Sequence, residues 1–273
     1  MKQNTRVCVL ASTSSGNCTA IWNDRVSLLV DCGMSASYTE DALARLGLCL
    51  QKLSAVFITH CHGDHVNRST LKRVIEHRVP VYCHGTVAKP LKKKYAFLQD
   101  KNCSLVACAE EGFGSCEGFR YDSFSVPHDS NGGCFGYSFF LTHAIGTHKI
   151  SIATDIGSAG PGLIARFSDS DIIIIESNHD VTLLAESSRP QWLKNRIVQY
   201  GHLSNDQCGE FIQEVLAASN NLPAAIVLAH ISQECNTNSR AKDRMHETLA
   251  IAKQRHIAVV ETYREKPSIV VCI

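Results

Sequence analysis

The sequence has no stretch of about 18 consecutive apolar residues, the length that a membrane-spanning helix requires. Its first residues are polar or charged and lead directly into a strand-like run, so they do not resemble a secretory leader. The net charge is only +1, and no long-range positive field marks the chain as a nucleic-acid binder. We therefore expect a cytoplasmic protein without a membrane span, in which any contact with nucleic acid depends on a local patch.

A disulfide framework is not indicated either, although the sequence contains 13 cysteines. The number is odd, the chain is long, and many of these cysteines lie inside apolar runs, as do Cys8, Cys32, Cys83 and Cys272. No pair has the two-residue spacing of a zinc knuckle. These features favour reduced and mostly buried thiols in a cytosolic protein.

The sequence also lacks a linker rich in Pro, Gly or Ser, so we expect one compact α/β domain over residues 1–273. Predicted strands are 6–11, 19–23, 26–31, 55–59, 80–83, 123–127, 135–141, 149–154, 171–176, 225–229, 258–261 and 269–272. Predicted helices are 40–46, 69–77, 191–200, 205–219 and 240–254, the second capped by Asn67 and the fourth by Ser204. Residues 89–118 have the least regular pattern.

The sequence does contain a dense cluster of metal-binding residue types at 59–65, Thr-His-Cys-His-Gly-Asp-His. The cluster ends a run of β-branched and aromatic residues, and such a run is typical of a buried strand, whose carboxyl end is where α/β proteins place their chemistry. Imidazole and carboxylate suit zinc, manganese or iron. The spacing lets His60 and His62 point one way while Asp64 and His65 reach a second ion. A merely solvated polar loop is a much weaker interpretation.

Four other apolar runs end in residues of the same types. They end at Asp31, at His128 with Asp129, at Asp155 and at His230. Each one alone is more often a cap or a satisfied polar group than a ligand. Together with the cluster, however, they supply the roughly six or seven ligands and the bridging carboxylate that a two-metal site needs.

The order and spacing of these residues resemble the metallo-β-lactamase superfamily over nearly the whole chain. The resemblance narrows to the YycJ/WalJ group at residues 12–17 (STSSGN), 176–180 (ESNHD), 192–196 (WLKNR), 201–205 (GHLSN) and 228–232 (LAHIS). The order of the last three motifs is also similar to ribonuclease Z. The resemblance implies a four-layer αββα sandwich of two mixed sheets with metals at its edge. The YycJ/WalJ group is linked to 5′-to-3′ DNA exonuclease activity.

The resemblance divides the ligands between two divalent ions, zinc or manganese, and gives them one shared carboxylate. The first ion is held by His60, His62 and His128, the second by Asp64, His65 and His230, and the bridge is Asp155. Two ions about 3.5–4 Å apart make hydroxide available from a bridging water near neutral pH and neutralise charge on a phosphoryl oxygen. Asp31 is expected to orient a ligand histidine and hold its tautomer.

Other motifs are candidates for substrate contact and proton transfer. Ser14, Ser15, Gly16 and Asn17 offer hydroxyl, amide and backbone N–H groups to a phosphate, although a plain β-turn also fits them. Asn178, Lys194 and Arg196 are further candidates, the last two for a nucleic-acid backbone, but a solvated helix face is the commoner fate of such a pair. His179 and His202 are surplus imidazoles, and either could protonate a leaving oxygen. An equally good interpretation of His202 is a structural residue at the start of the helix that follows.

The sequence thus predicts a dinuclear metal-dependent phosphodiester hydrolase, and the resemblance indicates a 5′-to-3′ exonuclease acting on DNA. One alternative is another hydrolase on the same scaffold, such as a cyclic phosphodiesterase or a glyoxalase-II-like thioesterase. A second is a non-catalytic, metal-binding regulatory protein, against which the complete ligand set argues. The chain departs from its neighbours in three respects: it lacks room for the extra domain of large RNA-processing members, a Gly-rich tRNA-binding arm, and the four-cysteine zinc site of some phosphodiesterases. The missing export signal argues against a β-lactamase.

Overall fold

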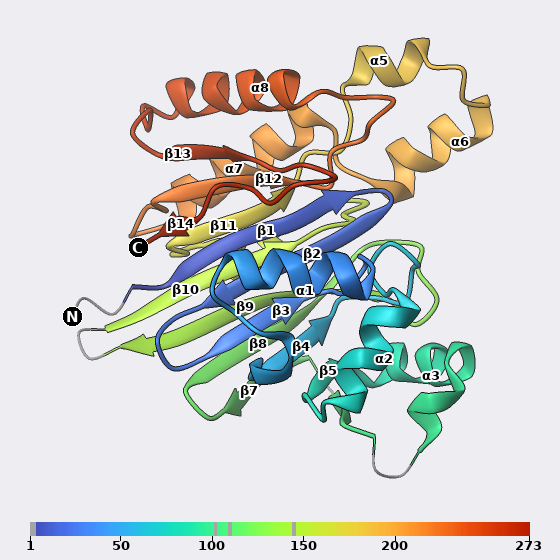
Figure 1. Ribbon diagram of the computed structural model, residues 1–273. Coiled ribbons are helices and arrows are strands. Elements are labelled where there is room, and N and C mark those ends of the chain that lie inside the picture. Colours follow the sequence, from blue (N-terminus) through green and yellow to red (C-terminus); the bar gives the residue numbers. More distant parts are fainter. Residues whose placement is uncertain (1–3, 101–102, 109–110, 144–145) are drawn as a thin grey trace.

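Two β-sheets pack face to face in the computed structural model of the chain, which describes residues 4–100, 103–108, 111–143 and 146–273 (Figure 1). Within these residues each sheet has seven strands. The first sheet has the order β14 (Val271–Cys272), β1 (Arg6–Thr13), β2 (Gly16–Trp22), β3 (Ser27–Val30), β4 (Ala55–Ile58), β5 (Val81–His84) and β6 (Leu105–Cys108). The second has the order β13 (Ala258–Glu261), β12 (Ala225–Ala229), β11 (Ile172–Glu176), β10 (Gly146–Ala153), β9 (Cys134–His143), β8 (Phe119–Val126) and β7 (Gly112–Cys116).

Both sheets are mixed, and helices connect their parallel strands. β3 to β6 run parallel in the first sheet, and β10 to β13 run parallel in the second. Parallel neighbours need a crossover connection. The crossovers of the first sheet carry α1 (Ala36–Arg45), α2 (Arg68–Glu76), α3 (Gly85–Lys94) and the 3₁₀ turns η1 (Leu50–Lys52) and η2 (Ala96–Gln99). Those of the second carry α4 (Pro161–Phe167), α5 (Val181–Glu186), α6 (Gln191–Arg196), α7 (Asn205–Ala218) and α8 (Asn238–Ile251).

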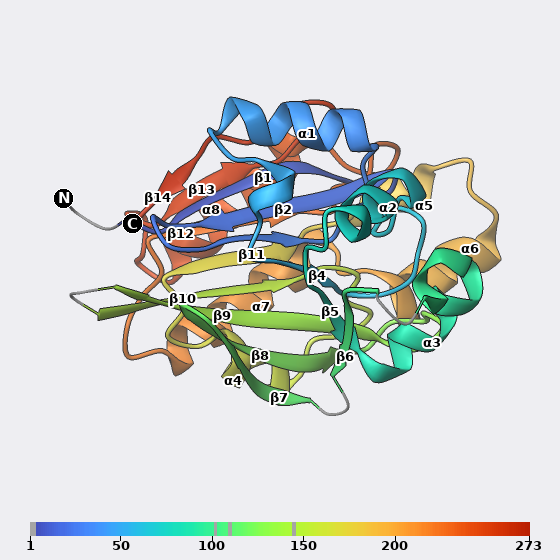
Figure 2. The same cartoon turned by 60° about the horizontal axis from the view of Figure 1, so that its bottom comes forward.

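The helices cover the outer faces of the two sheets, which gives the layer order helix, sheet, sheet, helix. Figure 2 shows α1 and α2 over the first sheet, with α4 and α7 on the far side of the second. This is the αββα sandwich that the resemblance implies, and the expectation is confirmed. None of the helices in the described ranges combines the length and apolarity needed to cross a membrane.

Two apolar cores fill the spaces between the layers, and β11 contributes to both. Ile172 and Ile174 lie in the core between the sheets, whereas Ile173 and Ile175 lie in the core beneath α4, α7 and α8. Successive side chains of a strand point to opposite faces, so a strand that is apolar at every position must be covered on both sides. This double burial explains the continuous apolar runs that predict the central strands.

A cluster of aromatic rings between the sheets anchors the strand that carries the metal-binding cluster. Phe57 on β4 has five aromatic neighbours, with ring centroids between 4.9 and 6.1 Å away. The hydroxyl of one of them, Tyr137, donates to the carbonyl of Ile58 at 2.8 Å. The end of β4 is therefore fixed just before the chain turns into His60.

The sequence-based prediction misses several helices and the edge strands β6 and β7. Residues 89–118 contain most of α3 as well as β6 and β7, and α4 and α5 are also not predicted. Pro90 interrupts the helical pattern of α3, while β7 is an edge strand with glycines at Gly112 and Gly114. The predicted helix 191–200 is divided into α6 and a π-helical turn, η3 (Ile197–Gly201).

Candidate metal centre

The predicted metal ligands lie where strands end, at one edge of the two sheets. The ends of β3, β4, β8, β10 and β12 are followed by Asp31, residues 60–65, His128, Asp155 and His230. Because parallel strands present their carboxyl ends at one edge, segments far apart in the sequence deliver these side chains to one place. The structure brings together all seven side chains that the sequence predicts as ligands.

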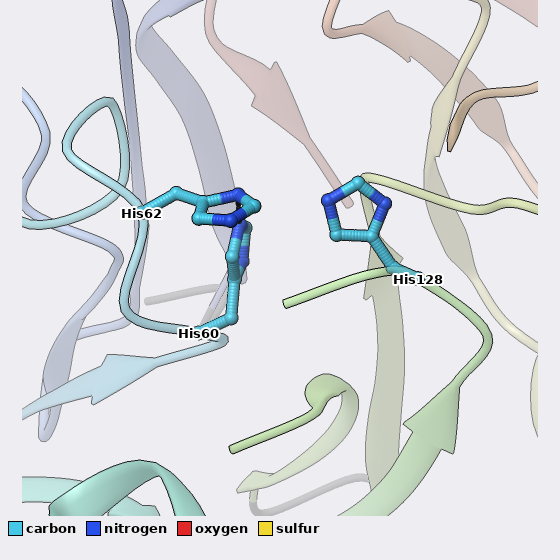
Figure 3. A group of neighbouring side chains, drawn as sticks. All are labelled: His60, His62 and His128. Atoms are coloured by element: carbon cyan, nitrogen blue, oxygen red, sulfur yellow. Dashed lines mark hydrogen bonds between the residues drawn. The ribbon is translucent and has the colours of Figure 1, made fainter. Parts of the chain in front are cut away.

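The seven side chains form two groups. The histidine group consists of His60, His62 and His128, and Figure 3 shows the first two rings, from the loop after β4, facing the third from the opposite side. The ring centroid of His128 lies 5.5 Å from that of His60 and 5.3 Å from that of His62. The carboxylate group consists of Asp64, His65, Asp155 and His230.

The distances within the carboxylate group suit a bound cation. His65 Nε2 lies 3.0 Å from Asp155 Oδ2 and 3.4 Å from Asp64 Oδ2. His230 Nε2 lies 3.5 Å from an oxygen of each of these carboxylates. Two atoms bound to one tetrahedral ion at about 2.0–2.1 Å are about 3.3 Å apart. Asp155 also reaches the histidine group, since its Oδ1 lies 3.8 Å from His128 Nε2.

Two buried atoms at the junction of the groups have no hydrogen-bond partner among the residues that the structure describes. They are His128 Nε2 and Asp155 Oδ2; the 3.0 Å approach of His65 Nε2 to Asp155 Oδ2 is a close contact without the geometry of a hydrogen bond. A buried polar atom without a partner is costly in free energy, so such atoms call for an explanation. A divalent cation would satisfy both, and the donor set of imidazoles and carboxylates therefore fits divalent metal ions.

Asp31 holds one ligand histidine from behind. Its Oδ2 lies 2.7 Å from His65 Nδ1, and its Oδ1 accepts a hydrogen bond from the backbone N–H of Thr59 at 2.9 Å. A proton on His65 Nδ1 leaves Nε2 with its lone pair facing the other ligands. This is the position that the sequence analysis expects for Asp31.

Glu176 joins the site, although the sequence analysis assigns it no role. It ends β11, is fully buried, and its Oε1 lies 2.8 Å from Nδ1 of both His202 and His230. Its Oε2 accepts hydrogen bonds from the backbone N–H groups of Ile156 and Leu203. The signal that identifies it is the one used elsewhere, a polar residue at the end of an apolar run.

The two groups differ in the pKa shifts of their histidines. Burial alone would lower the pKa of His65, but the neighbouring carboxylates, Asp155 foremost, outweigh it and raise that pKa well above its ordinary value. The same competition raises the pKa of His230 to about 10. In the histidine group, burial and neighbouring histidines lower the pKa of His60 and of His62. The carboxylate group therefore concentrates negative charge, whereas burial in the histidine group favours the neutral forms of His60 and His62.

Three site residues at strand ends have left-handed backbone conformations. The φ angles are 61° at Asp31, 57° at Asp155 and 54° at His230. Few residues other than glycine adopt this region, among which aspartate, asparagine and histidine are enriched. The conformation costs of order 1–3 kcal/mol per residue, so the surrounding fold maintains local strain at these positions.

A cavity of about 220 Å³ opens over both groups. Its floor includes His62 and His128 from the histidine group and Asp64, Asp155 and His230 from the carboxylate group. A molecule in this cavity therefore meets both groups at once.

The predicted substrate-contact residues near the amino terminus are only partly at this cavity. Ser14 lines it, whereas Ser15 and Gly16 do not. Asn17 is buried among the ligands, with its Nδ2 3.1 Å from His65 Nε2 and 3.4 Å from Asp64 Oδ2. Asn178 also lines the cavity, and its amide donates to the carbonyl of His230 at 2.8 Å.

The structure separates the two candidate proton donors. His202 lines the cavity, and its Nδ1 lies 2.8 Å from Glu176 Oε1 and 3.8 Å from Asp155 Oδ1. His179 instead lines a separate cavity beside α5, and burial lowers its pKa to about 4. Only His202 faces the space above the ligands.

Residues 181–201, which include α5, α6 and η3, form an arm that projects beside the site, at the upper right of Figure 1. Arg189 and Arg196 from this arm line the cavity over the ligands. Lys194 lies on the other face of α6, where its Nζ donates to the carbonyl of Ala185 at 2.6 Å. The structure thus brings Arg196, but not Lys194, to the cavity, and it adds Arg189, for which the sequence offers no pattern.

Comparison with known proteins identifies the class. The family model of the Beta-lactamase superfamily domain matches residues 27–231. The structure also superposes on YhfI of Bacillus subtilis, a metallo-β-lactamase fold protein, with a TM-score of 0.71 and 16% identity over 100% of both chains. The chain belongs to the β-lactamase superfamily. It is a metal-dependent hydrolase with the metallo-β-lactamase fold.

Within that superfamily the chain is similar to two curated nucleases. Exodeoxyribonuclease YycJ of Bacillus anthracis is 27% identical over 244 residues, covering 88% of this chain and 88% of YycJ. Exodeoxyribonuclease WalJ of Streptococcus pneumoniae is 30% identical over 250 residues, covering 89% of this chain and 88% of WalJ. The resemblance to the YycJ/WalJ group is therefore confirmed.

Proposed function

We propose that the chain, as a single hydrolase domain over residues 1–273, is a 5′-to-3′ DNA exonuclease. The observation that carries the proposal is the cavity in which both ligand groups face Arg189 and Arg196. Guanidinium groups at the rim bind phosphates beyond the one that reacts, which a polymer has and a thioester lacks. The similarity to two exodeoxyribonucleases supports the same substrate class.

The ligand groups are proposed to hold two divalent ions, for which zinc and manganese suit the donor set of five imidazoles and two carboxylates. The histidine group would hold one ion, Asp64, His65 and His230 the other, and Asp155 both. Such ions, when bound, lower the pKa of a water ligand and neutralise charge on a phosphoryl oxygen.

The chain's own residues orient the substrate and move the proton. His202 is the proposed proton donor, because Glu176 holds its Nδ1 and leaves Nε2 for the cavity. The contact with the buried carboxylate fixes the orientation of the ring, and a general acid must be oriented in this way to reach the leaving oxygen. Ser14 and Asn178, which line the same cavity, are proposed to contact the scissile phosphate.

The proposal is tested by comparing substrates across a salt series. The panel is end-labelled single- and double-stranded DNA, bis(p-nitrophenyl) phosphate and a glutathione thioester, each with manganese or zinc. We expect mononucleotides to be released from the 5′ end, at a rate that falls with salt through counterion release and is lost in His62→Ala. Thioester turnover with intact DNA would overturn the proposal.

Two basic residues on opposite faces of α6 sharpen the test. Arg196→Gln should reduce the slope of log affinity for DNA against log salt by about 1, since one phosphate contact is lost. Lys194→Gln is the matched control, because it removes the same charge from the face turned away from the cavity. Equal slopes for the two variants would show that the arm does not track the DNA backbone.

A further inference from the structure

Two aromatic side chains on the arm are exposed to an unusual degree for residues of their size. Trp192 is 67% exposed and Tyr200 is 62% exposed. Arg196 lies midway between them in the sequence. Trp192 and Arg196 both belong to α6, where side chains four positions apart are neighbours, and Tyr200 follows in the π-helical turn η3. The arm therefore carries an aromatic, basic, aromatic stripe, defined here as Trp192, Arg196 and Tyr200.

Two side chains of the stripe line adjoining cavities at the metal centre, and Trp192 lies one helical turn before Arg196 on α6, outside both cavities. Arg196 lines the cavity of about 220 Å³ over the ligands, and Tyr200 lines a neighbouring cavity of about 260 Å³. The two cavities share His128 and Asp129 in their walls. A chain-like ligand that follows the stripe therefore passes directly over a proposed metal ligand.

The chemistry of the stripe fits a strand of unpaired nucleotides. Arg196 Nε donates to Asp129 Oδ2 at 2.6 Å, but in the part of the chain that the structure describes its Nη atoms have no hydrogen-bond partner. Those groups can bind a phosphate, while exposed indole and phenol rings stack on bases. A duplex hides the faces of its bases, so only an unpaired strand can use all three side chains.

We propose that Trp192 and Tyr200 stack bases of a single-stranded nucleic acid while Arg196 binds the phosphate backbone between them. The inference rests on the proposed nuclease function and adds that the strand reaches the metals unpaired. Eight residues of helix span about 12 Å. That is about the length of three or four stacked nucleotides at about 3.4 Å each, so the stripe guides the last few nucleotides of a strand.

The test measures steady-state hydrolysis of a single-stranded oligonucleotide and of bis(p-nitrophenyl) phosphate. Loss of one stacked base weakens binding by about 5- to 150-fold, so Trp192→Ala should raise KM for the oligonucleotide by a factor in that range. Its turnover of the small diester should stay unchanged, because that substrate reacts over the ligands and Trp192 lines neither cavity there. Trp192→Phe should restore most of the affinity. Phe113→Ala is the matched control, because Phe113 is an aromatic residue 70% exposed on the distant edge strand β7.

An oligonucleotide with abasic positions near its 5′ end separates stacking from general damage. The wild type should bind it more weakly than the intact strand, and Trp192→Ala should bind the two equally. An unchanged KM in Trp192→Ala, with DNA still hydrolysed, would overturn the inference, leave the proposed function standing and point to a protein contact instead. An equal loss in Phe113→Ala would also overturn it. Failure of the wild type to hydrolyse any DNA would overturn both proposals.

Discussion

The histidine group and the carboxylate group of the metal centre differ in what surrounds them. His62 in the histidine group is half-buried, and the ring of His60 meets the hydroxyl of Thr59 and the thiol of Cys134 at its Nδ1, but no carboxylate. Every histidine of the carboxylate group is buried and has a buried carboxylate behind it, Asp31 or Glu176. The fold therefore assembles one half of the centre through buried charge. The other half consists of imidazoles without a carboxylate behind them, and two of these, His62 and His128, line the cavity.

The residue that joins the two halves should give the largest effect. Asp155→Asn removes the carboxylate that approaches both groups. We expect hydrolysis to fall by more than the about 10–100-fold that loss of an outer partner costs, because both ion sites are damaged. Activity and elemental analysis check this outcome. Full activity with two ions per chain would show that Asp155 is not the bridge.

Stability without metal should differ sharply between the halves. His65→Ala leaves Asp31 and Asp155 as buried carboxylates without their partner, and breaking such a buried pair costs about 3–5 kcal/mol of unfolding free energy. His62→Ala should change the unfolding free energy by no more than about 0.5 kcal/mol, as is usual for substitutions outside the core. Urea unfolding of both variants in a chelator measures the difference. Similar losses of unfolding free energy in the two variants would show that the two groups do not differ in their contribution to stability.

The carboxylates behind the ligand histidines, Asp31 and Glu176, should affect the binding affinity of one ion more than that of the other. Asp31→Asn and Glu176→Gln keep the shapes of the side chains but remove the charge behind His65 and His230. We expect affinity for one ion to fall by about 10–100-fold while the other ion binds nearly as before. Titration against a competing chelator resolves the two steps. Equal weakening of both steps would mean that the two halves do not act separately.

The smallest effect should come from the ion pair at the cavity mouth. Asp129 and Arg196 form a close pair, but their side chains are 36% and 48% exposed, so solvent screens the pair. Asp129→Ala should therefore change the unfolding free energy by less than about 1 kcal/mol. The buried pair of His65 with Asp31 is the reference in the same urea experiment. A loss comparable to that of His65→Ala would contradict the distinction between buried and exposed charge.

The residues that the sequence predicts for the metal centre follow one rule. A polar side chain that ends an apolar run lies at a strand end, and the strand ends meet at one edge. The rule applies to Glu176 as much as to Asp31. The sequence therefore carries a signal for Glu176, although the prediction does not use it. The order of the layers is predicted by the family resemblance. The periodicity of the sequence alone predicts strands and helices but not how they stack.

The substrate side could not be predicted in the same way, because it depends on which face of a helix a residue occupies. Lys194 and Arg196 are two positions apart and similar in chemistry, yet only Arg196 reaches the cavity. The π-helical turn η3 changes the helical register after Arg196, and the sequence carries no plain signal for it. His179 and His202 are likewise equivalent in the sequence and separated only by tertiary packing.

The left-handed conformations at Asp31, Asp155 and His230 also limit how this site can evolve. An L-residue pays roughly 1–2 kcal/mol in this region, and aspartate and asparagine enter it more readily than residues with longer side chains. Histidine shares that tolerance, and aspartate and histidine are also the side chains that bind these metals. Aspartate and histidine are therefore favoured at these strand ends, whereas glutamate, with the same charge, enters this region less readily. The backbone conformation thus favours aspartate over glutamate at these positions, independently of metal binding.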